Sequence, residues 1–293
     1  MSTQVTADQH TLYRTDLHPS ECDFERLIFP HTLLMLGQNA AEKDIELCPS
    51  LGREALEAQE IKWMISSVSY YLTGLRPVKG SQVLSETWSP GIKGINFLRS
   101  HLIFSERREA TQLVAHGSSR WFLVDRDSRK PLRPYEVVSE EDYKAYCAPD
   151  RGLSFRTLRI KPSKTATLYQ QDFAIGYSLL DDNYHLNNVN YISLAMDCLW
   201  SYFASRDLPL IDYQVREIHC NYVAEVRAGQ TLTLSLKQAE ANQPSSHACL
   251  FQGQDIDFSS QAPTQSWELT GHQKIEDKLD LAFRALIVLE EKS

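Results

Sequence analysis

The segment that most constrains the fold of this 293-residue chain is a polar run leading directly into an amphipathic helix. The run reads Asp181-Asp182-Asn183-Tyr184-His185-Leu186-Asn187-Asn188. Behind it, apolar residues recur at steps of three and four, the spacing of a helix that buries one face. Asn187 and Asn188 stand where a helix N-cap is favoured. The chain must therefore bury a helix whose N-terminus lies beside polar side chains. The apolar positions are Val189, Ile192, Met196, Leu199 and Phe203.

The polar run carries residue types suited to acid–base chemistry. Asp181, Asn183 and His185 are two residues apart, which in an extended segment turns their side chains to one side. They offer a charge or base, an orienting donor and a proton carrier. The helix start behind them has free backbone N–H groups that can hold an oxyanion. Polar residues before helices also form turns and caps without any function, so both interpretations are open from the residues alone.

Composition narrows the class of protein. With 42% hydrophobic residues and a net charge of −8, the sequence indicates a globular core and disfavours a nucleic-acid partner. The first residues show no signal or transit pattern, and no apolar run approaches the length of a membrane span. We therefore expect a cytoplasmic protein. The six cysteines form no Cys-x-x-Cys pair, so we expect reduced thiols, no metal and no other cofactor.

The two halves of the chain show a similar order of predicted elements. The first half predicts strands at 10–17, 60–75, 83–88, 95–104 and 113–124, with a helix from about 30 to 43 and a short helical piece after Gly52. Residues 131–166 contain four prolines and a short helix at 139–147. The second half predicts a helix at 188–205, a weak strand inside a long loop at 242–264, and strands at 168–177, 215–226, 231–237, 267–269 and 281–290. The repeat indicates a structural duplication.

The pattern Asp-x-Asn-x-His-x-Asn-Asn-x-x-Tyr, from Asp181 to Tyr191, resembles the signature of plant and bacterial acyl-acyl-carrier-protein (acyl-ACP) thioesterases. The resemblance runs from about Tyr13 to near the C-terminus. Just upstream of the motif the family has an Arg and a further Asp, where this chain has Gly176 and Leu179. The family's positions in the first half are interpreted as scaffold or acyl-chain lining. They are Ser85-Glu86-Thr87-Trp88, Arg99 and Ser118-Ser119-Arg120-Trp121.

The resemblance implies an α+β chain of two tandem hotdog domains, each a long helix wrapped by a curved antiparallel sheet. We predict an N-terminal domain over residues 1–135, a linker over 136–165 and a C-terminal domain over 166–293. The first-half helix start, around His31, lacks Asp-x-Asn-x-His, so we expect one active site, in the second half. The predicted substrate-binding residues are Asn187 and Asn188 beside the motif, with Met35, Trp63 and Met64 lining an acyl pocket in the first half.

Four catalytic residues are predicted: Asp181, Asn183, His185 and, by resemblance alone, Glu225 in Tyr222-Val223-Ala224-Glu225. Thioester hydrolysis needs an activated water and a stabilised oxyanion. Glu225 and His185 would activate the water, Asn183 would orient it or donate to the carbonyl, and amides near Asn187 would hold the oxyanion. Asp181 would fix this network or attack the carbonyl itself, and we prefer the water route. A metal on these side chains is disfavoured because only one is a histidine.

The predicted function is hydrolysis of fatty acyl-ACP to release free fatty acid. An acyl-CoA thioesterase is the alternative, because a net charge of −8 disfavours an acidic carrier even though Arg126, Arg129, Lys130 and Arg133 form a dense positive cluster. A non-catalytic acyl-binding double hotdog protein is opposed by the presence of all four predicted catalytic residues. A hotdog dehydratase is opposed by the whole motif, and a homodimer is a possible assembly. Acyl chain length is not encoded in any motif.

Overall fold

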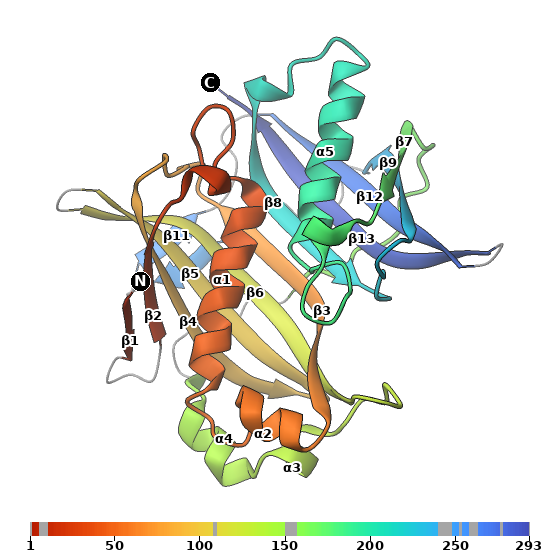
Figure 1. The fold of residues 1–293 in the computed structure, drawn as a ribbon. Coiled ribbons are helices and arrows are strands. Elements are labelled where there is room, and N and C mark those ends of the chain that lie inside the picture. Colours follow the sequence, from red (N-terminus) through yellow and green to blue (C-terminus); the bar gives the residue numbers. More distant parts are fainter. Residues whose placement is uncertain are drawn as a thin grey trace. The chain divides into compact units, whose positions relative to one another are not determined.

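The computed structural model describes residues 2–5, 11–107, 110–149, 157–239, 248–251, 254–257, 263–275 and 278–292. The chain divides into two compact units, which Figure 1 shows in ribbon form. Unit 1 comprises Met1–Thr157 and Cys249–Ile256, and unit 2 comprises Leu158–Ala248 and Asp257–Ser293. Within the described ranges, no helix has both the length and the hydropathy that crossing a membrane requires.

Unit 1 is an antiparallel sheet with the long helix α1 (Pro30–Ile45) packed against it. The strand order is β1-β2-β4-β5-β6-β3. Pro30 occupies the first turn of α1, where a missing N–H costs nothing, and the helix buries Leu33, Leu36 and Ala40. The predicted helix and strands are thus confirmed. The strands are β1 (Ser2–Val5), β2 (Thr11–Asp16), β3 (Ile61–Leu72), β4 (Gln82–Lys93), β5 (Asn96–Arg107) and β6 (Ala110–Asp125).

One predicted turn in unit 1 is wrong. The strand predicted at 83–88 was followed by a turn at Ser89-Pro90-Gly91 before the next strand at 95–104, but β4 continues through these residues to Lys93. The register against β5 shifts between Trp88 and Gly91, and Gly91 has a φ of 130°. Turn residues here form a β-bulge, which accommodates proline and glycine without ending the strand.

The stretch predicted as a linker, 136–165, begins inside unit 1. Its helix α4 (Glu140–Tyr146) buries Tyr143 and Tyr146 in a core shared with Leu51, Phe97 and Leu123. Two further short helices, α2 (Arg53–Ala58) and α3 (Pro134–Val137), and the 3-10 turn η1 (Pro19–Glu21) complete the unit. The prolines in this stretch led to the prediction of a linker. The buried tyrosines of α4 instead make that helix part of unit 1.

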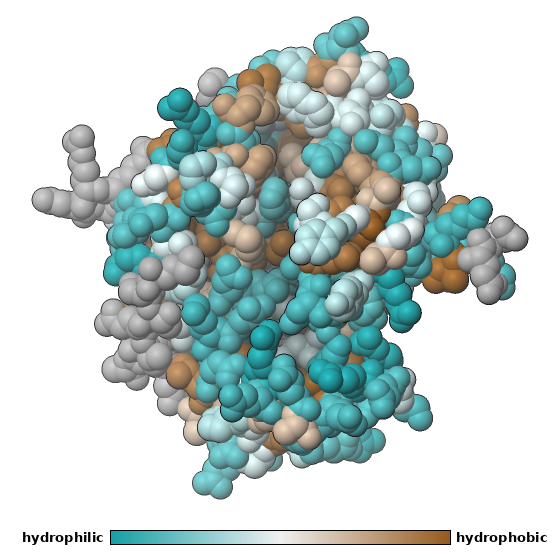
Figure 2. Space-filling view, in the orientation of Figure 1, coloured by the Kyte–Doolittle hydropathy of each residue, from teal (hydrophilic) through white to brown (hydrophobic). Residues whose placement is uncertain are grey.

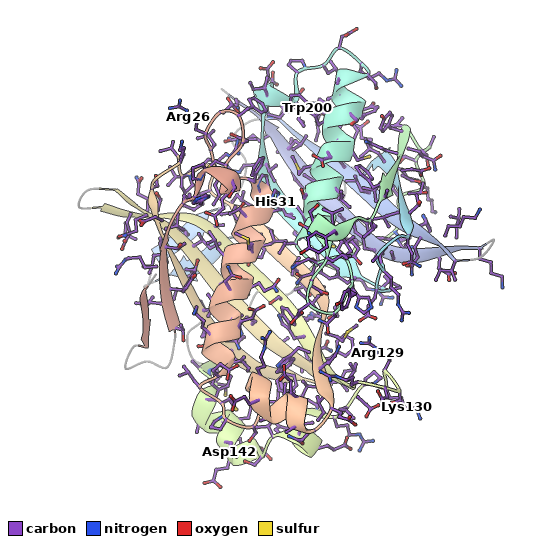
Figure 3. All side chains as sticks on the ribbon, viewed as in Figure 1. Arg26, His31, Arg129, Lys130, Asp142 and Trp200 are labelled. Carbon is purple, nitrogen blue, oxygen red and sulfur yellow. The ribbon has the colours of Figure 1, made fainter. Side chains whose placement is uncertain are left out.

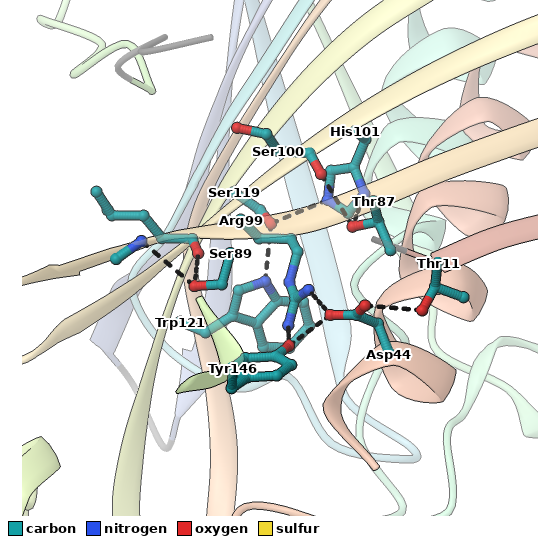
Figure 4. A network of polar contacts seen from close by, with 12 residues as sticks. Thr11, Asp44, Thr87, Ser89, Arg99, Ser100, His101, Ser119, Trp121 and Tyr146 are labelled. Atoms are coloured by element: carbon teal, nitrogen blue, oxygen red, sulfur yellow. Dashed lines mark hydrogen bonds and ion pairs between the residues drawn. The ribbon is translucent and has the colours of Figure 1, made fainter. Parts of the chain in front are cut away.

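The interior of unit 1 contains a buried polar network, drawn in Figure 4. Arg99 on β5 pairs with Asp44 of α1 and contacts the Tyr146 hydroxyl, and Thr11 donates to Asp44 over 2.8 Å. On the neighbouring strand the Trp121 indole donates to Ser119 over 2.8 Å. Arg99 therefore joins the sheet to α1, and Ser119 and Trp121 bond within β6, which supports their interpretation as scaffold.

Unit 2 has the same ingredients: an antiparallel sheet with strand order β8-β13-β12-β9-β7, and the helix α5 (Asn190–Ala204). Leu232, Leu234 and Leu236 of β9 are fully buried, which confirms the alternating pattern predicted there. The strands are β7 (Tyr169–Ala174), β8 (Tyr213–Tyr222), β9 (Thr231–Gln238), β12 (Thr264–Ile275) and β13 (Lys278–Glu291).

The remaining elements are short. Two 3-10 turns, η3 (Tyr177–Leu179) and η4 (Leu210–Asp212), flank α5 in the sequence. Strands β10 (Ala248–Phe251) and β11 (Gln254–Asp257) pair with each other. Much of the predicted loop at 242–264 lies outside the described residues.

Candidate active site

The motif forms a closed turn just before α5. Leu180 and Leu186 form a β-bridge, the Asp181 amide donates to the His185 carbonyl over 2.8 Å, and the Tyr184 amide donates to Asp181 over 3.1 Å. Tyr184 has a φ of 60°, in the left-handed region. The segment is therefore not extended. The prediction of an extended segment, from which a shared side of Asp181, Asn183 and His185 followed, is wrong.

The Asp181 side chain closes this turn. Its Oδ1 accepts the backbone amide of Asn183 over 2.8 Å and that of His185 over 3.2 Å. A short carboxylate that accepts amides two and four residues ahead stabilises a turn against alternative backbone conformations. Asp181 thus fixes the backbone of His185.

The structure brings His185 and Glu225 together. His185 Nδ1 lies 3.5 Å from Glu225 Oε1, and the two side chains are 11% and 26% exposed. Glu225 was predicted on a strand, but β8 ends at Tyr222, so Glu225 lies in the connection that follows. Backbone pairing supplies the proximity: the Leu186 amide donates to Val226 O over 2.7 Å, and His185 forms a β-bridge with Arg227.

The asparagines of the motif have different roles. Asn183 is exposed, and its Nδ2 donates to the Asp182 carboxylate over 3.1 Å. Asn187 Oδ1 accepts the Val189 amide over 3.1 Å in the turn before α5, but the N-cap residue is Val189, so the prediction that Asn187 or Asn188 caps the helix is wrong. The helix proper begins at Asn190, two residues later than expected, because the turn held by Asn187 comes first. The Asn188 carbonyl accepts the Tyr222 hydroxyl over 3.0 Å.

Several backbone amides at the start of α5 already donate hydrogen bonds within the protein. Those of Asn187, Val189 and Asn190 bind Leu179 O, Asn187 Oδ1 and Asn187 O. In the part of the chain that the structure describes, the amides of Asn188 and Tyr191 have no such partner. Unpaired amides at a helix start are donors for a ligand oxygen. Among these amides, the available donors lie one residue or more past Asn187.

Exposed aromatic and apolar side chains occur near the motif and Glu225 in the sequence. Tyr177, Tyr184 and Val223 are 94%, 76% and 57% exposed, and each lies within four residues of Asp181, His185 or Glu225 in the sequence. Figure 2 shows apolar surface (brown) beside the lower part of α5, the end of the helix at which the motif lies. Such exposure around a pair of titratable groups suits the binding of an apolar ligand.

The cysteines of unit 2 lie in its core. Cys198 and Cys220 are both fully buried. Burial raises the pKa of Cys198 to about 12, and it raises the pKa of Cys220 further. A thiol with so high a pKa is protonated at neutral pH and is a poor nucleophile. Neither is suited to attack a thioester.

The residues predicted to line an acyl pocket lie in unit 1. Met35, Trp63 and Met64 are half-buried. Trp63 packs edge-on against Phe97 at 4.8 Å, and its indole donates to Leu51 O over 3.4 Å. Because Trp63 and Met64 are consecutive on β3, their side chains point to opposite faces of the sheet. At most one of the two lines a pocket on a given face.

Two other predicted features have clear positions. The positive cluster, Arg126, Arg129, Lys130 and Arg133, is exposed in the loop after β6, where Figure 3 labels Arg129 and Lys130. Asp125 and Asp127 are interleaved with it, so the loop is only weakly basic. Among the described side chains, no group of three His, Cys, Asp or Glu is placed to hold a metal ion.

Unit 1 contains a second turn of the same construction, which the sequence did not reveal. Asp23 Oδ1 accepts the amides of Glu25 and Leu27 over 2.9 and 3.0 Å. The Asp23 amide donates to Leu27 O over 2.8 Å, and Arg26 has a φ of 65°. The Ile28 amide donates to Pro77 O over 2.9 Å, as Leu186 does to Val226. We call residues 22–29 and 73–80 the unit 1 loop pair, and residues 180–187 and 222–229 the unit 2 loop pair.

Comparison with known proteins gives the family. The acyl-ACP thioesterase N-terminal domain matches residues 10–142, and the C-terminal domain of the same family matches residues 163–268. No curated protein sequence matches the chain.

Solved structures share the fold. An acyl-ACP thioesterase from Bacteroides thetaiotaomicron is 15% identical with a TM-score of 0.73, over 97% of this chain and 100% of that one. A 12:0-ACP thioesterase from Umbellularia californica is 14% identical with a TM-score of 0.68, over 96% and 98%. With both domain matches in chain order and the motif in the second, the chain belongs to the acyl-ACP thioesterase family.

Proposed function

We propose that this protein hydrolyses the thioester bond of fatty acyl-ACP and releases free fatty acid, and that each unit is a hotdog fold. The observation that carries the proposal is the pairing of His185 Nδ1 with Glu225 Oε1 at 3.5 Å beside the start of α5. Family membership supplies the substrate class, and this pair supplies a base for water.

The His185 imidazole acts as the base. With Nδ1 facing the Glu225 carboxylate, Nε2 is the nitrogen that can accept a proton from water. The water oxygen attacks the carbonyl carbon while its proton passes to Nε2. The tetrahedral intermediate then collapses with cleavage of the C–S bond, and the imidazolium protonates the departing thiolate. Glu225 stabilises the imidazolium between the two steps.

The helix start holds the oxyanion in this mechanism. The unpaired amides of Asn188 and Tyr191 are the donors we assign to it. Asn183, exposed beside His185, keeps its predicted role of orienting water or the carbonyl. Asp181 is the orienting group, because its Oδ1 already accepts two amides and a nucleophile must leave those bonds to reach a carbonyl. This supports the water route.

The carrier and the acyl chain are parts of the same proposal. We propose ACP as carrier from the family, because the loop after β6 with its interleaved acids does not itself choose between ACP and coenzyme A. Met35, Trp63 and Met64 remain the proposed pocket residues in unit 1, with Trp63 and Met64 on opposite faces of β3. One methylene contributes about 1 kcal/mol in an apolar pocket, so the preference should be graded across neighbouring chain lengths. A cytoplasmic location and a homodimer stay predictions.

A panel of acyl-ACPs and acyl-CoAs of several chain lengths tests the function, with release of free thiol as the readout. We expect hydrolysis of both carriers with higher kcat/KM for acyl-ACP, and release by His185→Ala lowered by about 10² to 10⁴. Release of thiol from neither carrier by the folded protein would contradict hydrolysis. Higher kcat/KM for every acyl-CoA would replace ACP with coenzyme A as the carrier.

A further inference from the structure

The two proposed catalytic side chains come from different segments, and something must hold them in register. His185 lies in the turn before α5, whereas Glu225 lies three residues beyond the end of β8. The amides of Val223 and Ala224 donate to Ala282 O over 2.8 and 3.0 Å, which anchors this connection to β13. Those bonds set its position against the sheet but do not join it to the helix.

The Leu186 amide, which donates to Val226 O, joins the connection to the turn, and Tyr222 adds a side-chain bond to the helix start. The Tyr222 hydroxyl donates to the Asn188 carbonyl over 3.0 Å. Tyr222 lies three residues before Glu225, and Asn188 lies three residues after His185, so the bond ties the glutamate segment to the histidine segment. This part-buried hydrogen bond restrains both segments, because moving the two apart breaks it.

The ring of Tyr222 is held in turn by Tyr191, in the first turn of α5. The two rings meet edge-on at 5.4 Å, and Tyr191 also meets Phe283 of β13 edge-on at 4.9 Å. Tyr191 is only 4% exposed, so its ring has little freedom to turn. Edge-to-face aromatic pairs of this kind prefer one geometry, which fixes where the Tyr222 hydroxyl points.

Unit 1 supplies an internal comparison. Its loop pair has the same backbone bonds without the histidine or the glutamate. At the end of β3 it has Leu72 and Thr73 instead of the tyrosine, and Pro30 and Leu33 stand where unit 2 has Asn188 and Tyr191. The turn therefore closes without a tyrosine bond.

We infer that Tyr222 is a positioning residue of the active site, which acts through Glu225 by holding it against His185. The inference rests on the proposed function. The inference also explains why the motif contains Tyr191, whose ring packs against Tyr222 and holds it in place. Tyr222 touches no reacting atom in this scheme.

The test is Tyr222→Phe, which keeps the ring on Tyr191 and removes only the hydroxyl. Tyr213→Phe is the matched control, because Tyr213 begins the same strand and its hydroxyl accepts Gln265 over 3.4 Å. We expect Tyr222→Phe to lower kcat by about 10- to 100-fold with little change in KM, since small displacements of catalytic groups have effects of this size. Tyr213→Phe should leave kcat unchanged.

A double mutant separates positioning from general stability. If Tyr222 acts through Glu225, Tyr222→Phe should have no further effect on kcat in a Glu225→Gln background. Multiplicative losses, or a kcat for Tyr222→Phe near that of the wild type, would overturn the inference.

Hydrogen exchange gives a readout that needs no substrate. In Tyr222→Phe, exchange should accelerate in residues 184–191 and 222–229, and Tyr213→Phe should not change it there. Unchanged exchange in both segments would overturn the inference even if the protein hydrolysed no thioester. If Tyr222→Phe accelerates exchange but the wild-type protein hydrolyses no thioester, the structural role of the Tyr222–Asn188 hydrogen bond stands and the proposed function is refuted.

Discussion

The unit 1 and unit 2 loop pairs have the same backbone and different side chains. In both, an aspartate accepts two amides, the fourth residue has a positive φ, and the turn bonds to a second segment. Where unit 2 has His185, unit 1 has Leu27. Where unit 2 has Glu225, unit 1 has Arg76, which pairs with Asp23 at 2.6 Å.

The shared and the differing residues separate construction from chemistry. Asp23 makes the same bonds as Asp181 although Leu27 and Arg76 stand where unit 2 has His185 and Glu225. The aspartate therefore belongs to the architecture of the turn, and the imidazole and the second carboxylate are what unit 2 adds. This argues that Asp181 orients and does not attack.

The largest expected loss of kcat comes from changing His185 or Glu225, which have no counterpart in the unit 1 loop pair. His185→Ala and Glu225→Gln should each lower kcat by about 10² to 10⁴, the usual loss when a general base is removed. Steady-state kinetics with acyl-ACP, on variants whose circular dichroism and melting temperature match the wild type, measures this. Near wild-type turnover of either folded variant would remove the pair from the mechanism.

Arg76→Gln is the matched control in unit 1. It breaks the ion pair with Asp23 and should leave kcat within about twofold, because the side chain lies in the loop pair that lacks the chemistry. A loss as large as that of Glu225→Gln would mean that the two loop pairs are not functionally distinct.

A second difference between the helix starts predicts acid sensitivity. Unit 1 has His31 where unit 2 has Val189, and burial lowers the pKa of His31 from 6.5 to about 4. Between these values the unfolded chain binds a proton that the folded chain does not, so stability falls as the pH drops from 6.5 towards 4. His31→Val should reduce this loss by up to about 3 kcal/mol, given 1.36 kcal/mol per pKa unit. Urea unfolding of both proteins at pH 7 and pH 4 measures it, and an unchanged difference would contradict it.

The sequence predicted the elements better than the site geometry. The apolar periodicity of α5 and the alternating leucines of β9 locate those elements, because side chains on the buried face alone determine the period. The Asp181 turn was not predicted because its closure depends on Tyr184 in a left-handed conformation, and a tyrosine gives no indication of a positive φ. Nothing local marks Glu225, which lies 40 residues from His185 and meets it only through tertiary pairing.

The repeat of the turn in unit 1 was also hidden, for a related reason. Only the aspartate is common to Asp23–Leu27 and Asp181–His185 at the positions that build the turn. The other bonds are made by backbone groups, which every residue type carries. A duplication of this kind leaves almost no trace in side-chain identity.

A smaller effect is expected for Asp181→Asn. The amide oxygen can still accept the two backbone amides, so an orienting role predicts a loss of kcat of about tenfold or less, since neutral acceptors bind more weakly than charged ones. Asp23→Asn should lower the free energy of unfolding about as much as Asp181→Asn does, without changing kcat. A loss of kcat as severe as that of His185→Ala would favour a nucleophilic aspartate.

Isotope labelling sharpens the same distinction. A single turnover in ¹⁸O-water with enzyme in excess should place the label directly in the fatty acid if water attacks. Label in the Asp181 carboxylate, found by mass spectrometry of the peptide, would show an anhydride intermediate and overturn the water route.

The smallest expected effect concerns the thiols of unit 2. If a cysteine paired with His185 were the nucleophile, the difference between the unit 1 and unit 2 loop pairs would not explain catalysis, because neither cysteine of unit 2 belongs to the residues that make the reaction possible in the proposed mechanism. Cys198 and Cys220 are fully buried, and burial raises both pKa values, to about 12 for Cys198. We therefore expect Cys198→Ala and Cys220→Ser, singly and together, to keep most of the hydrolysis rate. Any loss should come with a lower melting temperature, because small buried side chains contribute packing. Loss of activity at an unchanged melting temperature would restore a cysteine–histidine mechanism and return the His185 and Glu225 pair to a supporting role.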